Sequence, residues 1–169
     1  DASAAVSGAD LVVICTPAAL VIPKLDEIRA ACEPHAVITD VASTKGDICA
    51  HAAATWPHPR RFVGSHPMAG SEKFGPEHAV PDLYEGSFTI IEHCARLAPE
   101  ARQMVTELWQ TLGSTVVEHE PLRHDECVAR TSHLPHVAAS ALAQLLAGYG
   151  HDIRPFIGKG FRDTTRVAG

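Results

Sequence analysis

Aromatic residues, clustered basic residues and long apolar runs are all scarce in this sequence. Aromatic side chains make up 5% of the 169 residues, and the formal net charge is −6. Nucleic-acid binding relies on clustered Lys and Arg and on aromatic stacking, so nucleic acid is not expected as a partner. The longest apolar stretches, 11–15 and 137–147, are shorter than the roughly 20 residues of a membrane-spanning helix. A membrane partner is therefore not expected either.

Cysteine pairs with metal-binding spacing are also missing. The five cysteines stand at positions 15, 32, 49, 94 and 127, an odd number without a C-x-x-C spacing. A disulfide framework or a zinc site is therefore not expected, and neither is any other metal site. We expect buried free thiols and a cytoplasmic location, because the cytoplasm keeps thiols reduced.

Strand-like and helix-like segments alternate in the first part of the chain. They are strand-like at 9–15, 36–41, 61–64, 87–91 and 115–118, and helix-like at 20–32, 46–55 and 99–112. Short runs rich in β-branched residues are typical of strands buried on both faces of a parallel sheet, and the helices carry apolar residues on one side. Ser43 or Thr44 is expected to cap the helix that begins at Gly46.

The pattern changes near Glu120. Residues 122–148 form one helix-like stretch, in which Pro135 removes a hydrogen bond and is expected to produce a kink. The alternating region predicts an α/β fold with a parallel sheet, and the remainder predicts an all-helical region. We therefore expect two domains, at 1–119 and 120–169.

Three of the expected strands end next to polar side chains. Thr16 follows the first strand, Ser43 follows the second, and the third runs into His66. Ligands of open α/β sheets bind at the carboxyl ends of the strands, so a functional site is expected there. A histidine, with an ordinary pKa of about 6.5, can act as a base at neutral pH. Ser and Thr also end strands as simple turn formers, so a structural role stays open on these grounds.

Two further clusters lie in the helical region. His133 and His136 are three residues apart and lie near one face of a helix, but a metal site would need a third ligand. Arg162 and Arg166 flank Asp163. A guanidinium can hold a carboxylate through two parallel hydrogen bonds. Ion pairs on a solvated surface helix are the simpler interpretation of this spacing alone.

Three motifs occur along the chain in the order GSHPMAGSE at Gly64–Glu72, TSHLPH at Thr131–His136 and GFRDTTRVA at Gly160–Ala168. In this order they resemble prephenate dehydrogenases. The segments 11–17 and 40–45 resemble the same family, so the resemblance covers nearly the whole chain. The family oxidises a cyclohexadienol with NAD or NADP and releases carbon dioxide. Prephenate gives 4-hydroxyphenylpyruvate in this reaction, and arogenate gives tyrosine.

The resemblance assigns roles to the reacting groups. It implies that His66 is the base that takes the proton of the ring hydroxyl. It also implies that Ser43 hydrogen-bonds that hydroxyl and aligns His66, and that Arg166 holds a substrate carboxylate. A neutral imidazole removes such a proton near pH 7. Carbon dioxide then leaves because the ring becomes aromatic, so the resemblance implies no metal.

The resemblance also implies how the pocket is lined. His136, and less directly His133, would line the substrate pocket. Glu72 and Asp163 would form an ionic network with Arg166 that gates the pocket.

The cofactor-binding part of the family pattern is incomplete. Thr16 and Pro17 match family positions that lie against NAD or NADP. No G-x-G-x-x-G turn for the pyrophosphate is present, and Gly8 is isolated. The resemblance thus implies a partial Rossmann-type parallel sheet, the start of an all-helical dimerisation domain and, for the full-length protein, a homodimer. We expect the chain alone to bind the dinucleotide weakly or not at all and to be inactive.

Other assignments stay open on the sequence. A β-hydroxy acid dehydrogenase of the same sheet type would use a helical lysine as its base, and no such lysine stands out. A Ser-His hydrolase built on Ser43 or Ser132 would need a G-x-S-x-G turn, which is absent. An arogenate dehydrogenase or a non-catalytic dimerisation or regulatory fragment fits the same motifs. Feedback inhibition by tyrosine does not follow from the sequence.

Overall fold

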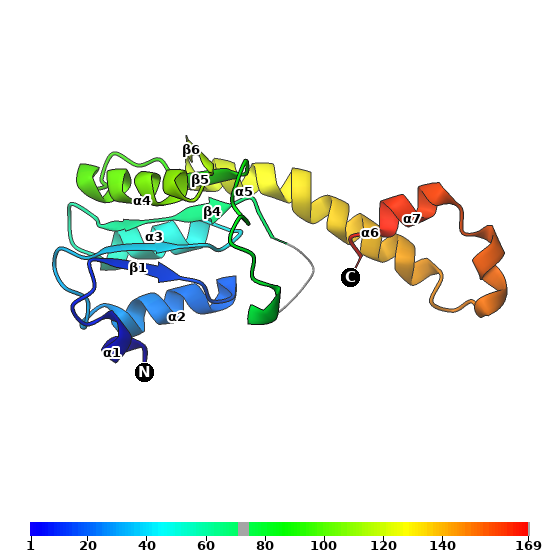
Figure 1. Cartoon of the computed structure of the whole chain (residues 1–169), viewed down its shortest axis with the longest axis horizontal. Coiled ribbons are helices and arrows are strands. Elements are labelled where there is room, and N and C mark those ends of the chain that lie inside the picture. Colours follow the sequence, from blue (N-terminus) through cyan, green and yellow to red (C-terminus); the bar gives the residue numbers. More distant parts are fainter. Residues whose placement is uncertain (71–74, 169) are drawn as a thin grey trace. The chain divides into compact units, whose positions relative to one another are not determined.

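The computed structural model describes residues 1–70 and 75–168, and the chain divides into two compact units (Figure 1). The first unit consists of Asp1–Gly70 and Ala79–Asp125, and the second of Ser71–His78 and Glu126–Gly169. No helix within the described residues is long and apolar enough to cross a membrane.

A three-stranded parallel sheet forms part of the first unit. Its order is β1 (Leu11–Ile14), β2 (Val37–Asp40) and β3 (Phe62–Val63). β-branched residues are frequent in these strands, and an extended backbone leaves room for their branched side chains. The α/β fold with a parallel sheet that the sequence predicts is confirmed.

Helices pack against both faces of this sheet, and β2 is buried along its whole length. The helices that begin in the first unit are α1 (Ala2–Val6), α2 (Ala18–Ile28), α3 (Gly46–Thr55), α4 (Pro99–Thr111) and α5 (Pro121–Val128). Ile38 and Phe62 belong to a core shared with α1, α2 and α3. Val37 and Val63 point the other way and share a second core with α4. Successive side chains of a strand face opposite sides, so each of these strands contributes to two cores.

A second three-stranded sheet lies in the same unit. It consists of β4 (Ser65–Pro67), β5 (Phe88–Glu92) and β6 (Thr115–His119), with β4 antiparallel and β6 parallel to the central β5. The sequence predicts one strand that ends as it reaches His66, and this detail is wrong. The chain leaves the first sheet at Gly64 and joins the second, where His66 pairs with Ile90. A paired strand holds a functional side chain more rigidly than a loop does.

The second unit is helical. It contains a 3-10 segment at Pro76–His78, a π-helical segment at Ala129–His133, α6 (Leu134–Leu145), a 3-10 segment at His151–Phe156 and α7 (Lys159–Thr165). α6 packs against α7. The long helical stretch expected at 122–148 is present as α5, the π-helical segment and α6 in succession. The π-helical segment ends two residues before Pro135, which has no N–H to donate to the preceding turn. The kink expected at Pro135 stays a prediction.

Candidate active site

Polar residues lie at the carboxyl edge of the parallel sheet. Thr16 and Pro17 follow β1, Ser43 follows β2, and the chain beyond β3 reaches His66. Because the three strands are parallel, these positions share one edge. Thr16 Oγ1 is buried without a hydrogen-bond partner among the described residues, whereas Ser43 is exposed. This edge therefore presents one exposed hydroxyl and one buried hydroxyl that can still form hydrogen bonds.

The ring of His66 is buried and contacts a second buried histidine, His124 of α5. His66 Nδ1 lies 2.9 Å from His124 Nε2. The ring centroids are 5.1 Å apart, and the ring planes meet at 80°. One hydrogen must lie between the two nitrogens, because two lone pairs or two N–H groups at this distance would repel each other. His66 is therefore held in place through Nδ1.

Asp125, the next residue on α5, connects His124 to the start of α3. Its Oδ1 lies 2.8 Å from His124 Nδ1. The same oxygen accepts the backbone N–H of Lys45 at 2.7 Å, and Oδ2 accepts that of Gly46 at 2.8 Å. The first N–H groups of a helix have no acceptor within the helix, so Asp125 caps α3.

This carboxylate replaces the helix cap that the sequence predicts. The prediction that Ser43 or Thr44 caps α3 is wrong, because Asp125 occupies that role from 79 and 80 residues further along the chain. Burial raises the pKa of the Asp125 carboxyl. The two backbone N–H groups and the adjacent imidazole outweigh burial, so the pKa lies below its ordinary value. The carboxylate is therefore ionised at neutral pH.

A buried ion pair anchors the loop that carries Ser43. Asp40, the last residue of β2, pairs with the Lys45 ammonium, and both side chains are almost fully buried. Asp40 also accepts the backbone N–H groups of Ala42 at 3.0 Å and Ser65 at 3.2 Å. Burial raises the pKa of the Asp40 carboxyl, and the ammonium and the N–H groups oppose that shift. Removing one partner of such a pair costs about 3–5 kcal/mol, so the loop is firmly held.

Ser65 ties the strand of His66 to β2. Its hydroxyl donates to the carbonyl oxygen of Asp40 at 2.5 Å and lies 2.9 Å from Thr39 Oγ1, and both hydroxyl side chains are fully buried. The preceding residue is Gly64, where a Cβ would stand 2.7 Å from Cys49 Sγ. The backbone before His66 is therefore confined on two sides.

A second buried ion pair joins Arg60 to Glu92 of β5. Arg60 also donates to the carbonyl oxygen of Cys49 at 2.9 Å. Burial raises the pKa of the Cys49 thiol, and the charge of Glu92 raises it further, so this thiol stays protonated and unreactive.

All five cysteines are free, but the expectation of buried thiols is correct for Cys49 alone. The others are half-buried or exposed, namely Cys15, Cys32, Cys94 and Cys127.

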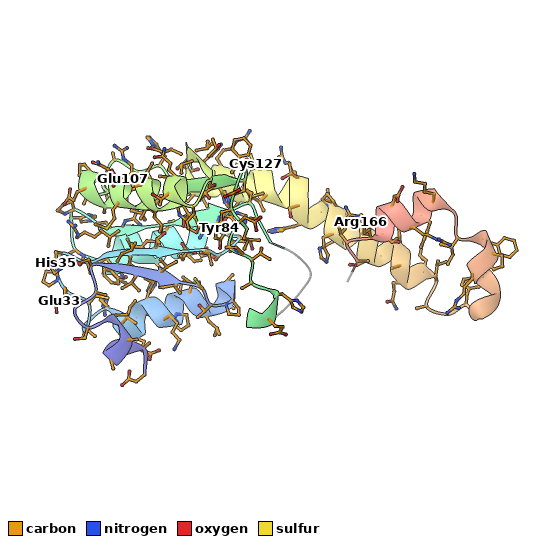
Figure 2. All side chains as sticks on the ribbon, in the orientation of Figure 1. Glu33, His35, Tyr84, Glu107, Cys127 and Arg166 are labelled. Carbon is orange, nitrogen blue, oxygen red and sulfur yellow. The ribbon has the colours of Figure 1, made fainter. Side chains whose placement is uncertain are left out.

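The remaining predicted site residues belong to the second unit, except Glu72, which lies outside the described residues. His133 is half-buried at the end of the π-helical segment, and His136 is exposed on α6. Arg166 is exposed directly after α7 and is labelled in Figure 2. Within 1–70 and 75–168, no group of three or more His, Cys, Asp or Glu side chains could hold a metal ion.

Sequence reasoning missed His124 and Asp125. No local pattern distinguishes them, because α5 resembles an ordinary surface helix and His66 lies 58 residues away from its partner. Asp40 and Lys45 offered a usable signal. A carboxylate ends a strand that carries no other charge, and a lysine follows five residues later. A charge in a buried strand requires a partner, so this pair could have been predicted.

A parallel sheet covered by helices on both faces, with polar residues at its carboxyl edge, defines a Rossmann-type nucleotide-binding domain. Residues 1–118 match the family model of the prephenate dehydrogenase nucleotide-binding domain. Residues 120–169 match the model of the prephenate dehydrogenase dimerization domain. The chain belongs to the prephenate dehydrogenase family.

Individual relatives agree with this family. The chain is 33% identical over 168 residues to the prephenate dehydrogenase of Bacillus subtilis (strain 168), across 96% of this chain and 45% of that protein. Its structure is similar to Synechocystis arogenate dehydrogenase, with 32% identity and a TM-score of 0.82 over 100% of this chain and 61% of that one. It is also similar to prephenate dehydrogenase from A. aeolicus in complex with hydroxyphenyl propionate and NAD+, with 31% identity and a TM-score of 0.86 over 94% of this chain and 56% of that one. The chain spans about half the length of the curated relatives that it matches.

Proposed function

We propose that the protein carrying this chain is an NAD- or NADP-dependent prephenate dehydrogenase of tyrosine biosynthesis. It would oxidise prephenate, release carbon dioxide and yield 4-hydroxyphenylpyruvate. The observation that carries the proposal is the buried ring of His66, held through Nδ1 by His124 beside the carboxyl edge of the parallel sheet. A fixed imidazole at that edge is suited to remove the proton of a ring hydroxyl.

In this reaction His66 takes the proton of the substrate hydroxyl through Nε2. Ser43, exposed in the loop after β2, donates or accepts a hydrogen bond at the same hydroxyl and orients it. A bound NAD or NADP would supply the acceptor for the hydride that leaves the hydroxyl-bearing carbon. The substrate carboxyl group then departs as carbon dioxide, and its bonding electron pair enters the ring, which becomes aromatic.

The substrate-binding roles rest on the motifs of the second unit. Arg166 holds a carboxylate of the dianionic substrate, and His136 and His133 line the pocket. Glu72 and Asp163 complete an ionic network with Arg166 that gates it. The side chains of Arg166 and His136 are exposed, which supports this assignment. A hydrogen-bond donor that binds a ligand must be accessible to it.

Thr16 and Pro17 are proposed to contact the nicotinamide cofactor at the end of β1. The buried hydroxyl of Thr16, without a partner among the described residues, supports a ligand at that position. A buried polar atom without a hydrogen bond costs free energy, which a bound polar group recovers. Thr16 and Pro17 therefore fit one part of a site for NAD or NADP.

We propose a cytoplasmic homodimer with domains at 1–119 and 120–169. Leu134, Val137 and Leu145 are exposed on α6 at a spacing that places them on one side of the helix. An exposed apolar stripe of this kind favours contact with another protein surface. Five free cysteines favour a reducing compartment.

The proposal is tested with His66→Asn in the full-length protein. Loss of a general base lowers kcat by about 10²- to 10⁴-fold, and we expect the KM for prephenate to change by less than about threefold. Prephenate-dependent formation of reduced cofactor is the measurement. His35→Asn is the matched control, because His35 precedes β2 at the opposite edge of the sheet, next to Glu33 (Figure 2). A wild-type kcat for His66→Asn would contradict the proposal.

Arogenate is the second candidate substrate, favoured by the similarity to the Synechocystis arogenate dehydrogenase. It differs from prephenate in carrying an amino group in the side chain. The same assay with both substrates gives two values of kcat/KM. A ratio of more than about tenfold in favour of arogenate would reassign the substrate and leave the role of His66 intact.

A further inference from the structure

We propose that His124 and Asp125 form a positioning relay that sets the tautomer of His66, with the hydrogen on Nδ1 and the basic lone pair on Nε2. The inference rests on the proposed role of His66 as the base. It adds two residues that touch neither the substrate nor the cofactor in this mechanism and act through the histidine alone.

The direction of the hydrogen bonds follows from Asp125. Both of its carboxylate oxygens already accept backbone N–H groups at the start of α3, from Lys45 and Gly46. An ionised carboxylate accepts hydrogen bonds and cannot donate one. The nitrogen that lies 2.8 Å from its Oδ1, His124 Nδ1, therefore carries a hydrogen.

The tautomer of His66 follows when His124 is neutral. A neutral imidazole has one N–H group and one lone pair. With its hydrogen on Nδ1, neutral His124 presents a lone pair at Nε2, which lies 2.9 Å from His66 Nδ1. His66 must donate from Nδ1, so Nε2 keeps the lone pair that removes a proton. Both rings are buried, so bulk water competes little for these bonds.

The relay is anchored in regular structure at each step. His124 and Asp125 lie on α5, and Asp125 caps α3. Lys45, whose N–H meets Asp125, is also held through its ammonium by Asp40 at the end of β2. One carboxylate thus caps a helix and orients a base, which links the stability of α3 to the geometry of His66.

The experiment compares two substitutions of His124 in the full-length protein. His124→Phe keeps an aromatic ring and removes the acceptor for His66 Nδ1, whereas His124→Gln keeps an acceptor oxygen. Partners that orient a metal-bound histidine are worth about 10- to 100-fold in activity, and we expect a loss of that order in kcat for the Phe variant. Its KM for prephenate should change by less than about threefold. The Gln variant should recover a kcat within about threefold of the wild-type value.

Nitrogen NMR of ring-labelled histidine reads the tautomer directly. The His66 signals are identified by their disappearance in His66→Asn. We expect a protonated Nδ1 and an unprotonated Nε2 in the wild-type and Gln proteins at neutral pH, and a mixture of tautomers in the Phe protein. A role of His124 in packing alone would lower the urea midpoint of the Phe variant without changing the tautomer of His66.

Four results would overturn the relay: a wild-type His66 protonated on Nε2, an unchanged His66 tautomer in the Phe variant, a wild-type kcat in the Phe variant, or a Gln variant as slow as the Phe variant. Failure of the proposed function has a different signature. In that case the His66→Asn variant would have the wild-type kcat, while NMR would still find His66 of the wild-type protein protonated on Nδ1.

Discussion

The two units of the chain differ in how they bury apolar side chains. The first unit has an apolar cluster on each face of its parallel sheet, and Leu25 of α2 is 0% exposed. In the second unit Leu145 of α6 is 69% exposed and Phe156 is 84% exposed. Among its described residues, Val128 and Ala139 are the only buried apolar side chains. The first unit therefore contains its own core, whereas the second is expected to complete one against a partner.

The polar residues follow the same division. His66 lies in a network of buried hydrogen bonds, while His136 and Arg166 are exposed. A base must keep its geometry within a fraction of an ångström, which a buried network provides. A guanidinium on a long side chain can adjust to the carboxylate that it binds. The comparison indicates that the residue proposed to transfer the proton is held more rigidly than the residues proposed to bind the substrate.

The difference in burial between the units is tested most sharply by making the same change, leucine to alanine, separately in each unit. Leu25→Ala empties a buried site and is expected to lower the free energy of unfolding by about 2–5 kcal/mol. Leu145→Ala, also on a helix, is expected to change it by no more than about 0.5 kcal/mol. Urea unfolding at the lowest practicable protein concentration gives both values. Equal losses would show that Leu145 is buried as deeply as Leu25.

A charge on α6 tests whether a second copy of the chain covers its apolar side. Leu145→Glu is expected to raise the dimer dissociation constant at least about tenfold, or about 1.4 kcal/mol, because the carboxylate must lose its hydration in the interface. Sedimentation velocity across a concentration series measures this constant. Ala147→Glu adds the same charge to an exposed residue two positions on and should leave the constant unchanged. An unaltered dimer in Leu145→Glu would place the interface elsewhere.

The smallest expected effect concerns pH and the cap of α3. The pKa of Asp125 is lowered on folding, so its contribution to stability is complete above the unfolded value of about 3.9. That contribution disappears as the pH falls through the lower folded value. Asp125→Asn should therefore cost about 1 kcal/mol at pH 6, and the stabilities of wild type and variant should converge once the pH has fallen below the folded pKa of Asp125. Urea midpoints across this range test the expectation, and a difference that persists in acid would mean that the charge of Asp125 does not matter.

Much of the first unit could be predicted because local pattern determines it. The β-branched run Val37-Ile38 marks a strand buried on both faces, and its structure is as expected. The change of sheet at Gly64 could not be predicted, because a three-residue strand paired with β5 has no local signature. The cap of α3 was assigned to Ser43 or Thr44 for the same reason. Nearby hydroxyls were visible in the sequence, whereas Asp125 becomes a neighbour only after folding.

The contact at Gly64 has a consequence for inheritance and for protein engineering. A Cβ at this position would lie 2.7 Å from Cys49 Sγ and 3.3 Å from Lys45 Cδ. Three positions thus share one small volume, and close-packed interiors tolerate little extra volume. A homologue with a larger residue at position 64 is expected to have a smaller residue at position 49, so the two positions should co-vary. If the strand of His66 is grafted onto another scaffold, the residues packed against Gly64, namely Cys49 and Lys45, must be grafted with it.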